Sequence, residues 1–267
     1  MTKNALAKAG EAKEVYQVPA LAPLLKDGKL TAQADTLASA FLEEVEGDRA
    51  TVPSLPIIRI DHKVECFMIN GEPQESIEGY PINFFQTRGY WSKSFRPGST
   101  EPPECFSVDM VKPHPSVGEP CATLCATCKF SQFGTAQSGD ADGQACRVTT
   151  YLCVLNPEFA GCPVGVVLCP PTSIRELIGS TRSPGYLSRA QQFERPNGQR
   201  AQFYEVVWSR FTLERAGDTH CVIIGEPLAT PSDEEEIRAI ARVRNSFRSE
   251  MDNLRGINAQ KSIESAG

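Results

Sequence analysis

The chain has 267 residues, of which 40% are hydrophobic and 22% are charged, with 10 cysteines and a formal net charge of −6. This composition allows one sizeable core or two small ones, and no run approaches the roughly 18 apolar residues that a membrane-spanning helix needs. Most of the negative charge lies in the flanks, residues 1–50 and 216–267. The middle of the chain is therefore close to neutral, and the net charge does not exclude a nucleic-acid partner.

Residues 1–50 are predicted to be a peripheral segment with one short helix over residues 35–46. Residues 1–13 alternate lysine, alanine and glutamate and lack the order of a signal peptide. We therefore expect a cytoplasmic protein in a reducing compartment, where clustered cysteines are metal ligands more often than disulfides.

Residues 51–230 are predicted to form an α+β, mainly β fold. Short β-branched or aromatic runs at residues 56–61 and 64–69 precede Asn70-Gly71, a strong signal for a hairpin turn. One helix is expected within residues 170–178. Further strands are predicted over residues 147–155, 164–169, 203–213 and 220–224. Several short strands separated by turns favour a small β-barrel over a parallel sheet.

The stretch from Gly79 to Thr100 combines aromatic and basic side chains and contains no acidic residue. Cationic side chains bind phosphates, and flat aromatic rings stack on unpaired bases. The pattern is therefore typical of a surface that binds single-stranded nucleic acid. The alternative is a pair of strands whose aromatic side chains face the core. The cations and rings of the stretch are Arg88, Lys93, Arg96, Tyr80, Phe84, Phe85, Tyr90, Trp91 and Phe95.

Cys125 and Cys128 form a C-x2-C knuckle. One further cysteine lies before the knuckle and one lies after it, a pattern that is typical of tetrahedral zinc sites. The segment between the knuckle and Cys146 is rich in glycine and small polar residues, so a metal would give it order that packing cannot. The sequence predicts a structural zinc subdomain over residues of about 100–150, with Cys121 and His114 as alternative ligands. The predicted ligands are Cys105, Cys125, Cys128 and Cys146.

Residues 231–256 are predicted to form a C-terminal amphipathic helix. The sequence from Ser232 to Glu235 is a capping box, and apolar residues recur after it at helical spacing. This apolar stripe must dock on the body of the protein or on a second copy, so self-association through the helix is one expectation. Residues 257–267 are polar and are predicted to be a disordered tail.

The cysteine segment resembles that of phage and prophage proteins described as single-stranded DNA-binding proteins. Residues 125–134 and 143–147 are similar to the family stretch C-x-x-C-P-x-x-x-W-G-S … G-K-G-K-A-C-K, and residues 168–173 are similar to its L-P-P-T-S-L-K. The resemblance spans residues 85–215 and implies an OB-like β-barrel with an inserted zinc subdomain, similar to the helix-destabilising protein of T-even phages. It also favours Cys105 over Cys121 as the remaining ligand, because the family has an earlier cysteine followed by a small-residue and acidic turn.

The chain departs from the family pattern at four positions. Lys129 replaces proline and Phe133 replaces tryptophan, while Gln144 and Thr149 replace basic residues. Fewer cations release fewer counterions when DNA binds, so the salt dependence of binding should be shallower than in the family.

The resemblance implies a phage-type protein that protects and organises single-stranded DNA in replication or recombination, in the host cytoplasm, with proteins of those processes as partners. The sequence contains no Walker loop, G-x-S-x-G elbow or dinucleotide fingerprint, which favours a binding protein over an enzyme. One alternative is a zinc-stapled protein-interaction, virion or regulatory module that does not bind DNA. The other is an enzyme that processes nucleic acid, such as a nuclease. The residues predicted to stack on bases are Tyr90, Trp91 and Phe133, and those predicted to contact phosphates are Arg88, Lys93, Arg96, Lys129 and Arg147.

Overall fold

The computed structural model describes residues 57–92, 103–136, 142–159, 163–195, 197–217, 220–231, 233–245 and 247–248. The predicted helix of residues 35–46, the predicted tail of residues 257–267 and the cations Lys93 and Arg96 lie outside these ranges. Within them the protein is mainly β, as the sequence predicts. Among the helices so described, none is both long enough and apolar enough to cross a membrane.

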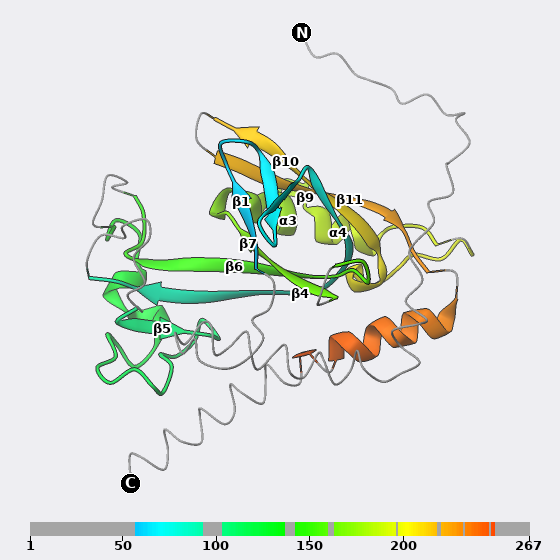
Figure 1. The fold of residues 1–267 in the computed structure, drawn as a ribbon. Helices are drawn as coiled ribbons and strands as arrows, with labels where there is room; N and C mark the ends of the chain where they lie inside the picture. The colour runs from blue at the N-terminus through cyan, green and yellow to red at the C-terminus, as the bar shows by residue number, and fades with distance from the viewer. Residues whose placement is uncertain are drawn as a thin grey trace.

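A curled sheet with the outline of half a barrel forms the body of the described part of the chain (Figure 1). Its strands follow the order β11-β10-β4-β6-β7-β1-β2-β3, and β5 pairs with β4 outside this path. The pairing of β1 with β7 is parallel, and the other pairings are antiparallel. The strands are β1 (Ile57–Asp61), β2 (Cys66–Ile69), β3 (Glu72–Gln74), β4 (Ser76–Tyr90), β5 (Cys105–Ser107), β6 (Cys146–Leu155), β7 (Val164–Cys169), β10 (Trp208–Ala216) and β11 (His220–Ala229).

The predicted turn at Asn70-Gly71 is confirmed. It joins β2 to β3, with Ile69 paired to Glu72 and positive φ angles of 51° at Asn70 and 86° at Gly71. Positive φ at both central residues gives a two-residue turn the twist that matches its flanking strands. Asparagine and glycine tolerate that conformation best, which is why the sequence signal was specific.

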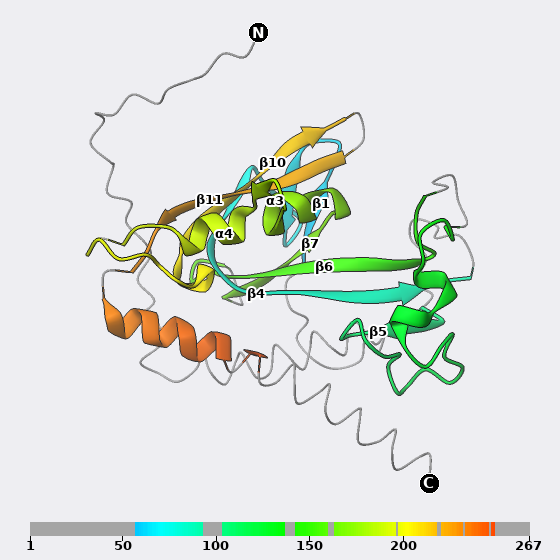
Figure 2. The same ribbon diagram turned by 180° about the vertical axis from the view of Figure 1, so that it is seen from behind.

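The longest strand, β4, connects the body of the sheet to the cysteine segment. Its first residues pair with β10, and the rest pair with β6. At its end, Arg88–Tyr90 lies between Cys105–Ser107 of β5 and Cys146–Val148 of β6. We call these three paired segments the arm. Figures 1 and 2 show the arm leading from the sheet to the cysteine segment, away from the helices.

Two short helices, α3 (Ile174–Ile178) and α4 (Tyr186–Gln191), pack against β11. The ring of Tyr186 lies directly on Gly225, where a Cβ atom would be 2.5 Å from the ring. Its hydroxyl donates to Ser209 Oγ at 2.7 Å. A small strand pair, β8 (Gly179–Ser180) with β9 (Ser183–Pro184), joins the two helices, and the 3-10 turns are η1 (Cys125–Thr127), η2 (Lys129–Ser131), η3 (Pro171–Ser173) and η4 (Tyr204–Val206).

The predicted C-terminal helix is present over residues 234–245 and 247–248. Asp233 Oδ1 accepts a hydrogen bond from the Glu235 N–H at 2.8 Å, which satisfies one of the free amides at the helix start. Ile240, Val243 and Phe247 are at most 1% exposed and belong to the same core as the sheet. In the single chain, the described part of this apolar stripe is therefore covered by the body of the protein.

Candidate functional site

The register of the arm brings two distant cysteines to one place. Tyr90, the last residue of β4, pairs with Cys105 on one side and with Cys146 on the other. Directly paired residues of a sheet point their side chains to the same face, so both cysteines lie beside the Tyr90 ring. All three side chains are less than 9% exposed and pack together as a small cluster apart from the main core.

The C-x2-C knuckle is built from two consecutive 3-10 turns, η1 and η2, with Cys125 opening the first and Cys128 standing between them. The Ser131 hydroxyl lies within hydrogen-bond distance of both cysteine carbonyls, 2.5 Å from that of Cys125 and 2.8 Å from that of Cys128. The Cys125 N–H donates to the Val111 carbonyl at 2.9 Å. These bonds fix the knuckle to the loop that follows β5, and both of its thiols are buried. We call residues 105–136 and 142–146 the cysteine lobe.

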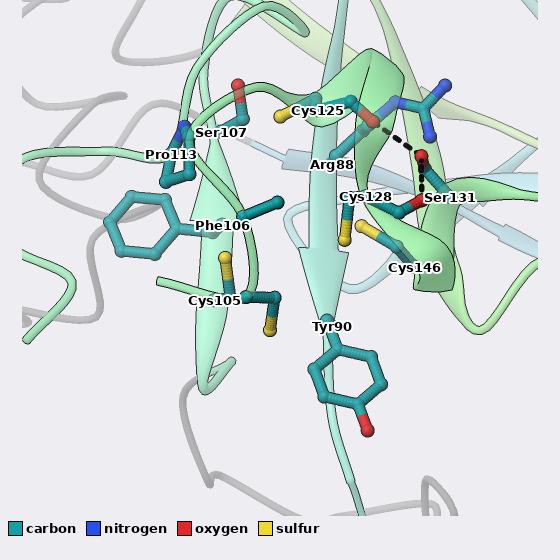
Figure 3. A pocket seen from close by; sticks show the side chains of 12 residues that line it. Arg88, Tyr90, Cys105, Phe106, Ser107, Pro113, Cys125, Cys128, Ser131 and Cys146 are labelled. Carbon is teal, nitrogen blue, oxygen red and sulfur yellow. Dashed lines mark hydrogen bonds between the residues drawn. The ribbon is translucent and has the colours of Figure 1, made fainter. Parts of the chain in front are cut away.

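One pocket of the lobe is lined by all the predicted cysteine ligands and by the alternative Cys121 (Figure 3). The other alternative, His114, does not line it: its ring stacks on Phe106 with centroids 4.8 Å apart, and its Nδ1 lies 2.8 Å from Ser116 Oγ. The nine cysteines within the described ranges all carry free thiols. The pocket residues are Arg88, Tyr90, Cys105, Phe106, Ser107, Pro113, Cys121, Ala122, Cys125, Cys128, Ser131 and Cys146.

The thiols influence one another. Burial raises the pKa of the Cys146 thiol to about 11, and three neighbouring cysteines add to this rise. Burial and the adjacent Cys105 raise the pKa of Cys121 to about 12. Burial also raises the pKa of Cys125, and the positive charge of Arg88 acts in the opposite direction on both Cys125 and Cys146. If ionised together these thiolates would repel one another, and a divalent cation among them would relieve that repulsion.

The donors suit zinc in kind and number, since thiolate is a preferred zinc ligand and four are needed. Their placement is looser than a metal site. Among the described residues, no group of three or more histidine, cysteine, aspartate or glutamate side chains is positioned to hold a metal ion. Closing the set to sulfur–zinc distances of about 2.3 Å would therefore require the thiols to move together.

The predicted DNA contacts on the arm divide between its two faces. Arg88 and Tyr90 lie two residues apart on β4 and face the cysteines. The Tyr90 ring also stacks on Phe130 of η2, with centroids 4.0 Å apart. Arg147 pairs with Gly89 and so lies on the opposite face, where its side chain is exposed.

Trp91 joins Arg147 on that outward face. A Cβ atom at Gly89 would be 2.7 Å from the Trp91 ring, so the ring covers the glycine. Because Arg147 is the cross-strand partner of Gly89, the indole and the guanidinium belong to neighbouring positions of one surface. Proteins that bind single-stranded nucleic acid combine aromatic rings with cations, and this face carries one of each.

The remaining predicted contacts lie in the cysteine lobe. Phe133 is 80% exposed, and its backbone bridges to Gln144. Lys129 is exposed, with its Nζ 4.8 Å from the centroid of the Phe130 ring. The lobe therefore carries one exposed ring, Phe133, and one exposed cation, Lys129.

Two features of the site were not predicted from the sequence. Arg88 lines the same pocket as the thiols, and the Ser131 hydroxyl bridges the two carbonyls of the knuckle. Successive side chains of a strand point to opposite faces. If β4 had been predicted, this alternation would have placed Arg88 on the same face as Tyr90 and on the other face from Gly89. The Ser131 hydrogen bonds depend on the conformation of two successive turns, for which the sequence carries no specific signal. No family model, curated protein or solved structure matches this chain.

Proposed function

We propose that this protein binds single-stranded DNA through the outward face of the arm, next to a cysteine lobe held together by a structural zinc ion. The observation that carries the proposal is the pairing of Gly89 with Arg147 beneath the Trp91 ring. A base stacked on an aromatic side chain contributes on the order of 1–3 kcal/mol, whatever its sequence. Trp91 would supply the stack and Arg147 a phosphate contact.

The cysteine lobe would extend this surface. Phe133 and Lys129 are exposed there and would offer a second stack and a second phosphate contact. Tyr90 is buried against Phe130, so we assign it to the packing of the lobe rather than to DNA. Lys93 and Arg96 follow Trp91 in the sequence and stay in the proposed set as phosphate contacts.

Zinc would be held by Cys125, Cys128 and Cys146, with Cys105 as the fourth ligand and Cys121 as its alternative. A closed site of four thiolates is structural, so the ion would supply stability to the lobe and no chemistry. In this proposal the lobe is a zinc subdomain inserted into an OB-like barrel, of which the curled sheet is the body.

The sequence resemblance to phage proteins agrees with this role. We expect the protein to protect and organise single strands during replication or recombination, in the cytoplasm of the host if the chain is phage-encoded. Proteins of those processes are the partners we propose.

A substitution on the outward face tests the proposal. Trp91→Ala should weaken binding of the zinc-loaded protein to a labelled oligo-dT by about fivefold or more, as expected for one lost stack. Phe203→Ala is the matched control, because Phe203 is 54% exposed and lies outside the arm and the lobe. Equal binding by wild type and the Trp91 variant would place the indole outside the DNA surface.

A protein-interaction module is the second candidate, and exposed apolar side chains on the lobe favour it. Val111 is 54%, Leu124 is 39% and Phe133 is 80% exposed. If the wild-type protein fails to bind oligo-dT at low salt, this apolar group becomes the functional surface to examine.

A further inference from the structure

The charged end of Arg88 lies beside the C-x2-C knuckle of the cysteine lobe (Figure 3). Its Nε and Nη1 atoms are buried, and neither has a hydrogen-bond partner among the described residues. The side chain lines the pocket of the five cysteines, and Figure 3 shows it beside Cys125, Cys128 and Ser131. A buried N–H group without a partner is costly, so in a stable fold it usually serves a group that completes its bonding.

Thiolate sulfur would complete the bonding of this guanidinium. A zinc ion with four thiolates leaves two net negative charges in a pocket that is largely removed from water. An arginine nearby offsets one of these charges, and its N–H groups can donate to the ligand sulfurs.

We infer that Arg88 is a positioning residue of the metal centre, donating from Nε and Nη1 to ligand thiolates and offsetting their charge. The inference rests on the proposed binding of zinc by the lobe. It removes Arg88 from the residues expected to contact phosphate and leaves that role on the arm to Arg147, which lies on the opposite face.

The test compares three variants of the full chain. Arg88→Gln removes the charge, Arg88→Lys keeps the charge without the two fixed N–H groups, and Lys112→Gln removes an exposed cation of the same lobe as a control. Zinc affinity is measured by competition with a chromophoric chelator. The absorption spectrum of the Co²⁺-loaded protein provides a second readout, which reports directly on the sulfur ligands.

Arg88→Gln should lower zinc affinity about 10–100-fold, the usual range for loss of an outer-shell partner. Its thiolate-to-cobalt charge-transfer band should move to longer wavelength, because sulfur lone pairs lose the stabilisation of the nearby cation. Arg88→Lys should fall between wild type and Arg88→Gln, and Lys112→Gln should match wild type in both measurements.

The outcomes separate this inference from the proposed function. A wild-type protein that binds no zinc would refute the metal centre and the inference together. One zinc per chain in wild type, with the same affinity and cobalt spectrum in Arg88→Gln, would overturn the inference alone. If Arg88→Gln does not fold, the test rests on Arg88→Lys. An Arg88→Lys variant with the zinc affinity and the cobalt spectrum of wild type would contradict the role of the fixed N–H groups.

Discussion

The ring of Tyr90 stacks on the ring of Phe130, with centroids 4.0 Å apart and planes inclined by 16°. Tyr90 ends β4 and Phe130 lies in the second turn of the knuckle, so the contact fastens the cysteine lobe to the sheet. The same tyrosine separates Cys105 from Cys146 in the strand register. It therefore lies at the centre of the lobe's packing.

Removing the Tyr90 ring should destabilise the protein. Tyr90→Ala deletes a buried aromatic side chain and should lower the free energy of unfolding by about 3 kcal/mol. Tyr90→Phe keeps the stacked ring and should cost less than about 1.5 kcal/mol. Urea unfolding of the zinc-loaded protein measures both. A Tyr90→Ala variant of unchanged stability would show that the stacking on Phe130 does not hold the lobe.

The knuckle cysteines should be needed for the metal. Cys128→Ser should abolish binding of zinc and the protection of the lobe from proteolysis, because structural zinc contributes its binding free energy to folding. Cys153→Ser is the matched control, because the Cys153 thiol is fully buried in the main core. The Cys153→Ser protein should bind as much zinc as wild type. Retention of one zinc and an unchanged melting temperature in Cys128→Ser would mean that the ligand set is wrong.

Local patterns were sufficient to predict several elements. The Asn70-Gly71 turn, the strands at β6 and β7 and the C-terminal helix all follow from residues close together in the chain. β4 was not predicted, because the glycine and proline residues within it weaken the sequence pattern of a strand. In the structure, pairing with β6 and β10 forms the strand despite these residues. β5 has three residues, too few to give a periodic signal.

The candidate site shows the same division. The cysteine pattern predicted four ligands of one zinc ion, with Cys121 as an alternative. These five cysteines line one pocket, and the binding of zinc there stays a prediction. The spacing could not say which face of the arm each aromatic or basic residue would occupy. That depends on the register of β4 against β5 and β6. Arg88 pairs with Ser107, 19 positions away, and with Val148, 60 positions away, so the register is not a local property of the sequence.

Gly89 should matter for the position of Trp91. In Gly89→Ala the new Cβ would meet the far end of the indole at 2.7 Å, so the ring must move away while the strand stays paired. We expect oligo-dT binding to weaken by about fivefold or more, as in Trp91→Ala, with a loss of stability below about 1 kcal/mol. Tryptophan fluorescence should change as well. Unchanged binding and fluorescence together would contradict the proposed surface.

A buried carboxylate should hold the C-terminal helix in place. Glu205, with a side chain 5% exposed, accepts a hydrogen bond from Arg248 Nη2 at 2.9 Å and lies 3.5 Å from Arg244 Nη1. Glu205→Gln leaves two arginines without their counter-charge and should lower the free energy of unfolding by about 1–3 kcal/mol.

The control for Glu205 is an exposed ion pair on the same helix. Glu234 pairs with Arg238 at 2.9 Å, and both side chains are more than 70% exposed. Glu234→Gln should change stability by less than about 0.5 kcal/mol, since solvent screens such a pair. If the two substitutions lower the free energy of unfolding in urea equally, the buried ion pairs of Glu205 stabilise the protein no more than the exposed pair does.

The most direct measurement is fluorescence anisotropy of a labelled oligo-dT with the zinc-loaded wild-type protein, titrated with salt and repeated with duplex DNA. We expect binding that weakens from about 50 mM to 200 mM salt, with a slope set by a few phosphate contacts, and far weaker binding to duplex. No binding to oligo-dT at about 50 mM salt, or equal affinity for the duplex, would contradict the proposal that this protein binds single-stranded DNA.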